Sequence, residues 1–203
     1  MKPVILLIFV FLATVSCQDV VEIIGGSNFD NANTEKFVRE IVQFISTLEP
    51  FPDITISYRP LCAANNTNNP CTGEKQQLAK NIMCMQEYLV GYSLPSVDYL
   101  YKNKNEPNFD EMVNDQLRCG CGSDQFVGPI ATNIRDCSTS AEGDKLVKQA
   151  QKKKPNPNGA YSLVINTEPI AHANLSTNVA EILCPLDSIR DYHVCDDVIC
   201  VVE

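Results

Sequence analysis

The stretch VVEIIGGSNFDNANTEKFVREIVQFI (residues 20–45) predicts a strand, a short loop and an amphipathic helix, in that order. Residues 20–24 are mostly apolar, and Gly25 and Gly26 end this run. A helix then begins near Asn33, because asparagine commonly caps helix N-termini. One face of the helix is apolar at helical spacing, which indicates that it packs on a core. The apolar positions are Phe37, Val38, Ile41, Val42, Ile45 and Leu48.

A second strand follows the prolines at positions 50 and 52. In it, Ile54, Ile56 and Tyr58 alternate with polar residues, as in a half-buried strand. A strand, a crossover helix and a second strand of these lengths most simply form a right-handed parallel unit. The loop from Gly25 to Asn33 then lies at the carboxyl end of the first strand, where many α/β proteins bind ligands. We therefore expect this loop to decide the function.

Residues 1–17 are typical of a secretory signal peptide. Lys2 precedes an apolar run over residues 4–12, and small and polar residues follow up to Cys17. The alternative, a retained anchor, is disfavoured because spanning a bilayer takes about 20 apolar residues. We expect cleavage near Cys17, leaving a domain of residues 18–203 in a secreted or endolysosomal lumen with no membrane span.

The chain is acidic, with 16 Lys and Arg against 25 Asp and Glu and a formal net charge of -9. This balance argues against nucleic-acid partners, which need a basic face. The one basic run, residues 152–154, follows a helical pattern and precedes Pro155. Lysines at that position complement the helix dipole, which favours a solvated helix end over a phosphate-binding patch.

Ten cysteines are the second strong constraint on the fold. They are Cys17, Cys62, Cys71, Cys84, Cys119, Cys121, Cys137, Cys184, Cys195 and Cys200. Behind a signal peptide, most of these should form disulfides. If Cys17 is removed, an odd number remains, so one thiol is free or pairs between chains. We expect no metal and no cofactor, because the chain has only two histidines and no Cys-x-x-Cys knuckle.

The region from about 60 to 137 is interpreted as a cysteine-bearing, mostly helical insertion. Apolar periodicity predicts helices over Glu74–Tyr92, Asn108–Leu117 and Asp124–Arg135. An Asn-rich loop precedes them, and a bridge between Cys62 and Cys71 could close it.

Two Asn-x-Ser/Thr sequons, at Asn65 and Asn174, are candidate glycosylation sites. In a secreted chain they support surface positions for both asparagines.

After Cys137 the sequence predicts a capped helix, the strand Ala160–Ile165 and a hairpin turn at residues 166–169. A short return strand follows, and Ser176 is expected to cap a last helix that ends at Cys184. The overall order is β-α-β, helical insertion, α, β-β, α. This is the order of an α/β, thioredoxin-like fold with a disulfide-rich, mostly helical insertion.

These segments resemble the gamma-interferon-inducible lysosomal thiol reductases (GILT). The matching stretches share short motifs around cysteines, and they cover most of the chain after residue 17. They are Cys62 with Cys71-Thr72-Gly73, Cys84-Met85-Gln86-Glu87, Asp136-Cys137-Ser138, residues 142–146, Leu163-Val164-Ile165-Asn166, Leu183-Cys184 and Cys195. The resemblance implies a thiol oxidoreductase that acts on protein disulfides, with structural disulfides among Cys62, Cys71, Cys84, Cys137, Cys184 and Cys195.

The departures from this family concern its catalytic site. Family members carry Cys-x-x-Cys at the start of the first helix, and those positions fall on Asn31 and Thr34. An amide and a secondary alcohol supply neither the thiolate nor the leaving group of disulfide exchange. The family's proline beside the site is absent from residues 159–163, and its Gln-His-Gly is replaced by the Asn-rich loop. Three losses around one site suggest a redox-inactive relative.

Catalysis could instead have moved within the chain. Cys119 and Cys121 form a Cys-x-Cys pair, whose disulfide would be strained and easily reduced. The plainer interpretation is that each makes a separate structural bridge, since the neighbouring glycines are equally good turn residues. His193 could activate a thiolate at Cys195, or could lie beside a structural disulfide.

Three functions follow from these observations. The first is a redox-inactive protein that acts by binding, using the loop Gly25–Asn33 to recognise a protein partner. The second is an active reductase of disulfide-containing proteins through Cys119 and Cys121 or an unpaired cysteine. The third is a secreted structural glycoprotein. A count of free thiols separates the second from the other two.

Overall fold

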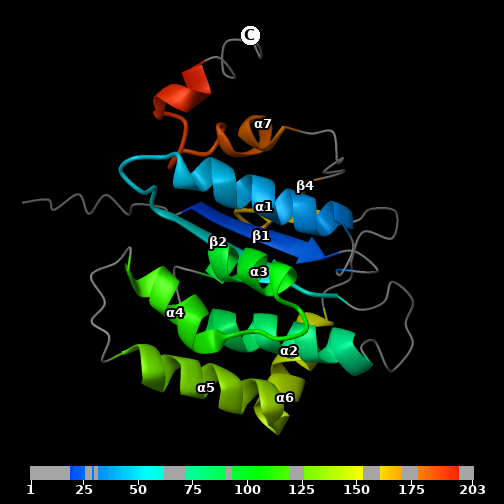
Figure 1. The fold of residues 1–203 in the computed structure, drawn as a ribbon. Helices are drawn as coiled ribbons and strands as arrows, with labels where there is room; N and C mark the ends of the chain where they lie inside the picture. Colours follow the sequence, from blue (N-terminus) through cyan, green and yellow to red (C-terminus); the bar gives the residue numbers. More distant parts are fainter. Residues whose placement is uncertain are drawn as a thin grey trace, which may run out of the picture.

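The protein has a mixed α/β fold in which helices lie on both sides of a four-stranded sheet (Figure 1). This computed structural model describes residues 19–25, 29, 32–61, 72–89, 93–118, 126–152, 161–170 and 178–196. The expected signal peptide, residues 1–17, lies outside the described residues. So do seven candidate positions: Asn31, Cys62, Asn65, Cys71, Cys119, Cys121 and Asn174.

The predicted parallel unit is confirmed. β1 (Asp19–Gly25) pairs in parallel with β2 (Ile54–Arg59), and α1 (Ala32–Ser46) connects them. Val21 lies opposite Ile56, so their side chains share one sheet face. Five of the six apolar positions predicted for this helix are buried and Val42 is partly buried, so the apolar stripe packs into the core, although Leu48 lies after the end of α1.

Two further strands complete the sheet on the far side of β1. β3 (Tyr161–Ile165) pairs antiparallel with β1, and β4 (Glu168–Ile170) pairs antiparallel with β3. The strand order is β2-β1-β3-β4, and β3 runs opposite to the other three. β1 therefore lies in the middle of the sheet, with paired strands on both sides.

The β3–β4 hairpin turns on Asn166 and Thr167, whose φ angles are 48° and 73°. Positive φ at both central residues matches the twist of a two-residue hairpin, and asparagine tolerates that region well. The turn is shorter than the four residues predicted, because Glu168 already pairs with Ile165 and Pro169 with Val164.

A helical half lies on the opposite side of the sheet from α1 (Figure 1). It contains α2 (Gly73–Tyr88), α4 (Phe109–Arg118), α5 (Val127–Thr139) and α6 (Ala141–Ala150). α2 packs against α5 and α6, and α4 packs against α5. The helices predicted in the insertion are therefore present, although the first ends at Tyr88 rather than Tyr92. The helix predicted after Cys137 packs with them.

One helix was missed from the sequence. α3 (Ser93–Lys102) packs against α1, α2 and β2, so it joins the two halves of the molecule. Pro95 lies in its first turn. A backbone N–H at that position would have no acceptor within the helix, so proline, which lacks the N–H, is tolerated there. Leu94, Val97 and Leu100 are buried at a spacing close to the helical period.

Two disulfides tie these elements together. Cys84 of α2 is bonded to Cys137 of α5, with a Cα–Cα distance of 5.8 Å. Cys184, after the last helix, is bonded to Cys195, with a Cα–Cα distance of 5.4 Å. All four cysteines are buried. They belong to the six for which disulfides were predicted.

The C-terminal part of the described chain lies beside α1. It contains α7 (Val179–Leu183) and a short 3-10 helix (His193–Cys195), and α7 packs on α1. The cap of α7 is Asn178, whose Oδ1 accepts a hydrogen bond from the Ala180 N–H at 3.0 Å. The prediction that Ser176 caps this helix is therefore wrong by two positions. Both residue types suit an N-cap, so the sequence alone did not distinguish them.

The outer edge of β2 is closed by one side chain of α2. The Tyr58 N–H donates to Gln86 Oε1 at 2.7 Å, and Gln86 Nε2 donates to the Tyr58 carbonyl oxygen at 2.6 Å. The side-chain amide thus takes the place that a neighbouring strand would occupy. This protects an edge that could otherwise pair with another chain.

Among the helices of the described residues, none has the length and apolar character that crossing a membrane requires.

Candidate functional site

The carboxyl end of β1, where the sequence predicted a functional loop, is filled by buried aromatic side chains. Phe29, Tyr58 and Tyr101 are 0%, 1% and 4% exposed. Phe29 follows β1, Tyr58 belongs to β2 and Tyr101 to α3. The two tyrosine rings meet edge to face, with their centroids 6.2 Å apart. We refer to these three residues as the aromatic plug.

A chain of hydrogen bonds holds the aromatic plug together. The Tyr101 hydroxyl donates to the Phe29 carbonyl oxygen at 3.0 Å, and the hydroxyl oxygens of Tyr58 and Tyr101 are 2.6 Å apart. Because a hydroxyl has one hydrogen and that of Tyr101 goes to Phe29, Tyr58 donates to Tyr101. The Phe29 N–H donates to the Leu61 carbonyl oxygen at 3.2 Å. Phe29, four residues after the end of β1, is thus fixed through both of its backbone polar groups.

Gly25, the last residue of β1, has no room for a side chain. A Cβ built there would lie 2.7 Å from the Phe29 Cβ, 2.9 Å from the Tyr58 hydroxyl oxygen and 3.2 Å from the Arg59 carbonyl oxygen. These distances are shorter than van der Waals contact. The glycine therefore permits the close approach of the aromatic plug to the end of the strand.

The first turn of α1 is also covered by other parts of the protein. Thr34, one of the two positions matched to the family's redox cysteines, is fully buried. Glu35, the next residue, forms a partly buried ion pair with Lys104, whose ammonium lies 5.5 Å from the centre of the Tyr101 ring. The side chain at position 34 therefore faces the protein interior and cannot reach the disulfide of a bound protein without rearrangement.

No free thiol occurs among residues 19–25, 29, 32–61, 72–89, 93–118, 126–152, 161–170 and 178–196, because the four cysteines there form the two disulfides. Cys195 is consequently not a thiolate that His193 could activate. The His193 ring instead forms a hydrogen bond with Asp196 on the surface. Cys119 and Cys121, the alternative redox pair, lie outside the described residues.

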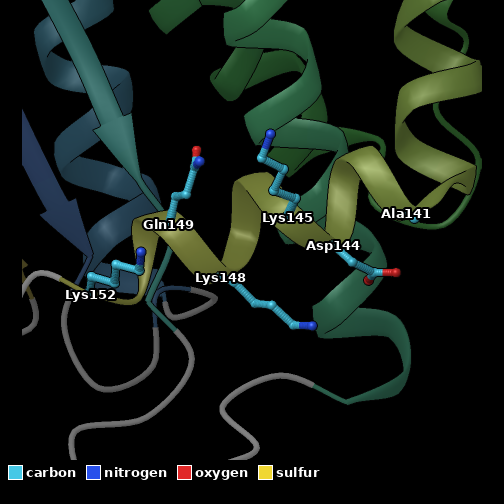
Figure 2. A pocket seen from close by; sticks show the side chains of 6 residues that line it. All are labelled: Ala141, Asp144, Lys145, Lys148, Gln149 and Lys152. Carbon is cyan, nitrogen blue, oxygen red and sulfur yellow. The ribbon is translucent and has the colours of Figure 1, made fainter.

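On the surface, a shallow hollow of about 510 Å³ lies along α6 (Figure 2). Five of its lining residues recur at helical spacing along α6, and the sixth lies in the turn after the helix: Ala141, Asp144, Lys145, Lys148, Gln149 and Lys152. Figure 2 shows the Lys145 and Lys148 side chains leaving the helix in different directions. The hollow is therefore basic over a broad face rather than at one point.

The described part of the chain contains no group of three or more His, Cys, Asp and Glu residues placed to hold a metal ion.

The sequence located the end of β1 correctly but did not reveal what fills it. Tyr58 was predicted as an inward-facing strand residue, which is correct. Its partners Phe29 and Tyr101 were missed, because 72 residues separate them and Tyr101 lies on the missed helix. The apolar positions of α3 at helical spacing are the signal that could have placed Tyr101 in the core.

In comparisons with known proteins, the sequence matches no family model and no curated protein.

Proposed function

We propose that this protein is a GILT-like, thioredoxin-like protein of a secreted or endolysosomal lumen that has no redox activity and acts by binding a protein partner. The thioredoxin-like part is supported by the element order and by the sheet order β2-β1-β3-β4, in which only β3 is reversed. The resemblance around Cys84, Cys137, Cys184 and Cys195 supports the family. Two buried disulfides suit an oxidising compartment.

One observation carries the absence of redox activity. A thiol oxidoreductase needs an accessible cysteine whose thiolate is stabilised at a helix N-terminus. Neither matched position is a cysteine: Asn31 lies outside the described residues, and Thr34 is buried in the first turn of α1. The aromatic plug fills the adjoining end of β1. This arrangement offers no described thiol for disulfide exchange, which supports a role in binding rather than in redox chemistry.

Capture of partners on the immobilised protein tests this proposal. The bait is incubated with secreted or vacuolar extract and washed without reductant, and then with dithiothreitol. We expect a partner that remains after the dithiothreitol wash and is released by salt or denaturant. The matched control is a reduced and alkylated bait, which has lost the fold and should not retain that partner.

Two results would contradict the proposal. Partners released by dithiothreitol alone would indicate mixed disulfides and therefore the reductase function. No partner beyond those of the unfolded control would indicate the structural glycoprotein instead.

A further inference from the structure

The lysines of α6 form a basic face on a chain that is otherwise strongly acidic. The sequence from Lys145 to Lys152 contains three lysines and no acidic residue, whereas the whole chain has a net charge of -9. Lys145, Lys148 and Lys152 are all exposed and all line the hollow. Positive charge is therefore concentrated along α6 and the turn that follows it.

The single acidic residue at the hollow interacts mainly with a lysine outside it: Lys80 and, more weakly, Lys148 lower the pKa of Asp144. The Asp144 carboxylate lies 2.7 Å from the Lys80 ammonium on α2 and accepts a hydrogen bond from Gln76 Nε2 at 3.0 Å. Lys80 is largely buried, so Asp144 serves to balance its charge. Because the charge of Asp144 is balanced mainly by Lys80, the three exposed lysines give the hollow a net positive charge that is available to an external anionic group.

α6 has this surface because its other side is committed to the core. Gly143, Val147 and Ala150 are buried, and Gly143 is packed so closely that a Cβ would lie 2.7 Å from the Cys137 carbonyl oxygen. The helix therefore cannot turn its lysines inward. Its orientation is further fixed by the Cys84–Cys137 disulfide, since the Cys84 sulfur is 3.4 Å from the same Cβ position.

We propose that the basic face of Lys145, Lys148 and Lys152 binds an extended acidic segment of a partner protein. This inference rests on the proposed binding role and names the surface and the chemistry of its partner. At about 1.5 Å of rise per residue, the three lysines span roughly 10 Å, the length of three or four residues of an extended chain. The charge of the face is complementary to such a segment.

The face suits a peptide better than an anionic membrane. Apart from the lysines and Asp144, its lining residues are Ala141 and Gln149, and no large apolar side chain is among them to insert into a bilayer. The hollow is also concave, and a concave surface fits a narrow peptide segment better than it fits a flat membrane. The remaining negative charge of the chain would repel a large anionic surface more than a short peptide.

Fluorescence anisotropy with a labelled peptide of alternating Glu and Ser, about twelve residues long, tests this proposal at low salt. We expect saturable binding that weakens about tenfold when Lys145, Lys148 and Lys152 are all changed to Gln. The matched control changes Lys36, Arg135 and Arg190 to Gln, which alters the net charge equally on other surfaces. It should weaken binding less than about twofold.

Three outcomes would overturn the proposal: no binding of the peptide by the wild-type protein, equal weakening in both triple variants, or binding to phosphatidylserine vesicles without binding to the peptide. Urea unfolding of each triple variant verifies that the fold is intact, and Lys148→Glu alone gives a second, milder disruption in the same direction. Because this assay measures no redox activity, its failure is distinguishable from a failure of the proposed function.

Discussion

Asn166 joins the β3–β4 hairpin to the first residue of β1, because its Nδ2 donates a hydrogen bond to Asp19 Oδ1 at 2.7 Å. The Asn166 Oδ1 also accepts from the Val20 N–H at 2.8 Å, and the second Asp19 oxygen accepts from the Ser188 N–H at 2.8 Å. The buried Asp19 carboxylate thus connects three segments that are far apart in the sequence.

Changing Asn166 to Ala should lower the free energy of unfolding by about 2–4 kcal/mol. The change removes two hydrogen bonds, one of them to a charged group, and places alanine at a positive φ. Asn166→Gly separates these causes, because glycine keeps the backbone conformation and loses only the hydrogen bonds. Urea unfolding measures both variants.

Asn133→Ala, at an exposed position of α5, is the matched control and should change stability by less than about 0.5 kcal/mol. If Asn166→Ala were equally harmless, the hairpin would not depend on this residue.

Stability should also depend on pH through Asp19. Burial opposes the charged form, but hydrogen bonds from the Asn166 side chain and the Ser188 amide outweigh it, so the pKa of Asp19 is lowered. The unfolded state then binds more protons than the folded state as the pH falls below the ordinary aspartate pKa. The stabilisation that the ionised Asp19 carboxylate gives to the folded state is therefore fully present above the ordinary aspartate pKa. It is lost as the pH falls through the lower pKa that Asp19 has in the folded state.

This pH dependence is measured by urea unfolding of the wild-type protein and of Asp19→Asn between about pH 2.5 and 7. The curve of the wild-type protein should fall more steeply than that of the variant at the acidic end. Parallel curves would show that Asp19 does not carry the effect.

Gly25→Ala tests the close packing of the aromatic plug against β1. The new methyl group would lie within 3 Å of the Phe29 Cβ and the Tyr58 hydroxyl oxygen, both of which belong to buried residues. We expect a loss of about 1–3 kcal/mol in the free energy of unfolding. Gly128→Ala in α5 is the control, because nothing lies within 4 Å of its Cβ position.

Gly128→Ala should change stability by less than about 1 kcal/mol, because the helix preference of alanine is offset by Pro129, which disfavours helical backbone at a preceding residue with a Cβ. The urea midpoint should therefore fall clearly for Gly25→Ala and stay near the wild-type value for Gly128→Ala. A stabilising Gly25→Ala would mean that the end of β1 has space that the structure does not show.

The hydroxyl chain of the plug predicts coupling between Tyr58 and Tyr101. Each Tyr→Phe change alone should lower the free energy of unfolding by about 1–3 kcal/mol, because it removes at least one hydrogen bond between buried polar groups. The loss of unfolding free energy in the double variant should be about 1 kcal/mol smaller than the sum of the losses in the two single variants. Urea unfolding of the four proteins in the cycle measures this coupling.

Tyr99→Phe is the control for the loss of a tyrosine hydroxyl. Its hydrogen bond to Glu111 is long, at 3.4 Å, and lies at the surface, so the cost should stay below about 0.5 kcal/mol. Strict additivity in the Tyr58 and Tyr101 cycle would argue that the two hydroxyls act independently.

The two disulfides should differ in their contribution to stability. The Cys84–Cys137 bridge closes 53 residues of sequence and Cys184–Cys195 closes 11. From the entropy of loop closure in the unfolded chain, replacing Cys84 and Cys137 with alanine should lower the free energy of unfolding by about 4 kcal/mol. Replacing Cys184 and Cys195 should lower it by about 3 kcal/mol. Unfolding without reductant measures both double variants. A larger loss for the shorter loop would indicate that packing around Cys184 and Cys195 dominates over loop closure.

The parts of the fold that the sequence predicted are those with local periodic signals. Phe37, Ile41 and Ile45 recur at helical spacing, so the core-facing side of α1 could be read directly. Asn166 marked a hairpin, because asparagine tolerates the backbone conformation of a tight turn. The parallel pairing of β1 and β2 followed from the length of the helix between them.

The rest depended on contacts between distant residues. The pairing of Cys84 with Cys137 is not encoded in spacing, since many connectivities satisfy the same cysteine count. Tyr101 could not be placed on Phe29 without knowing that residues 93–102 form a helix beside β2. Pro95 makes that helix hard to predict, because proline usually argues against a helix.

The central claim, the proposal that this protein has no redox activity, is tested most directly by insulin reduction. The protein without residues 1–17 and its Cys119→Ser variant are assayed with a low concentration of dithiothreitol from about pH 4.5 to 7.5, with thioredoxin as the positive control near neutral pH. The account predicts that neither protein reduces insulin faster than dithiothreitol alone at any pH. Turnover by the wild-type protein that disappears in Cys119→Ser would contradict the account and place an active site in the helical region.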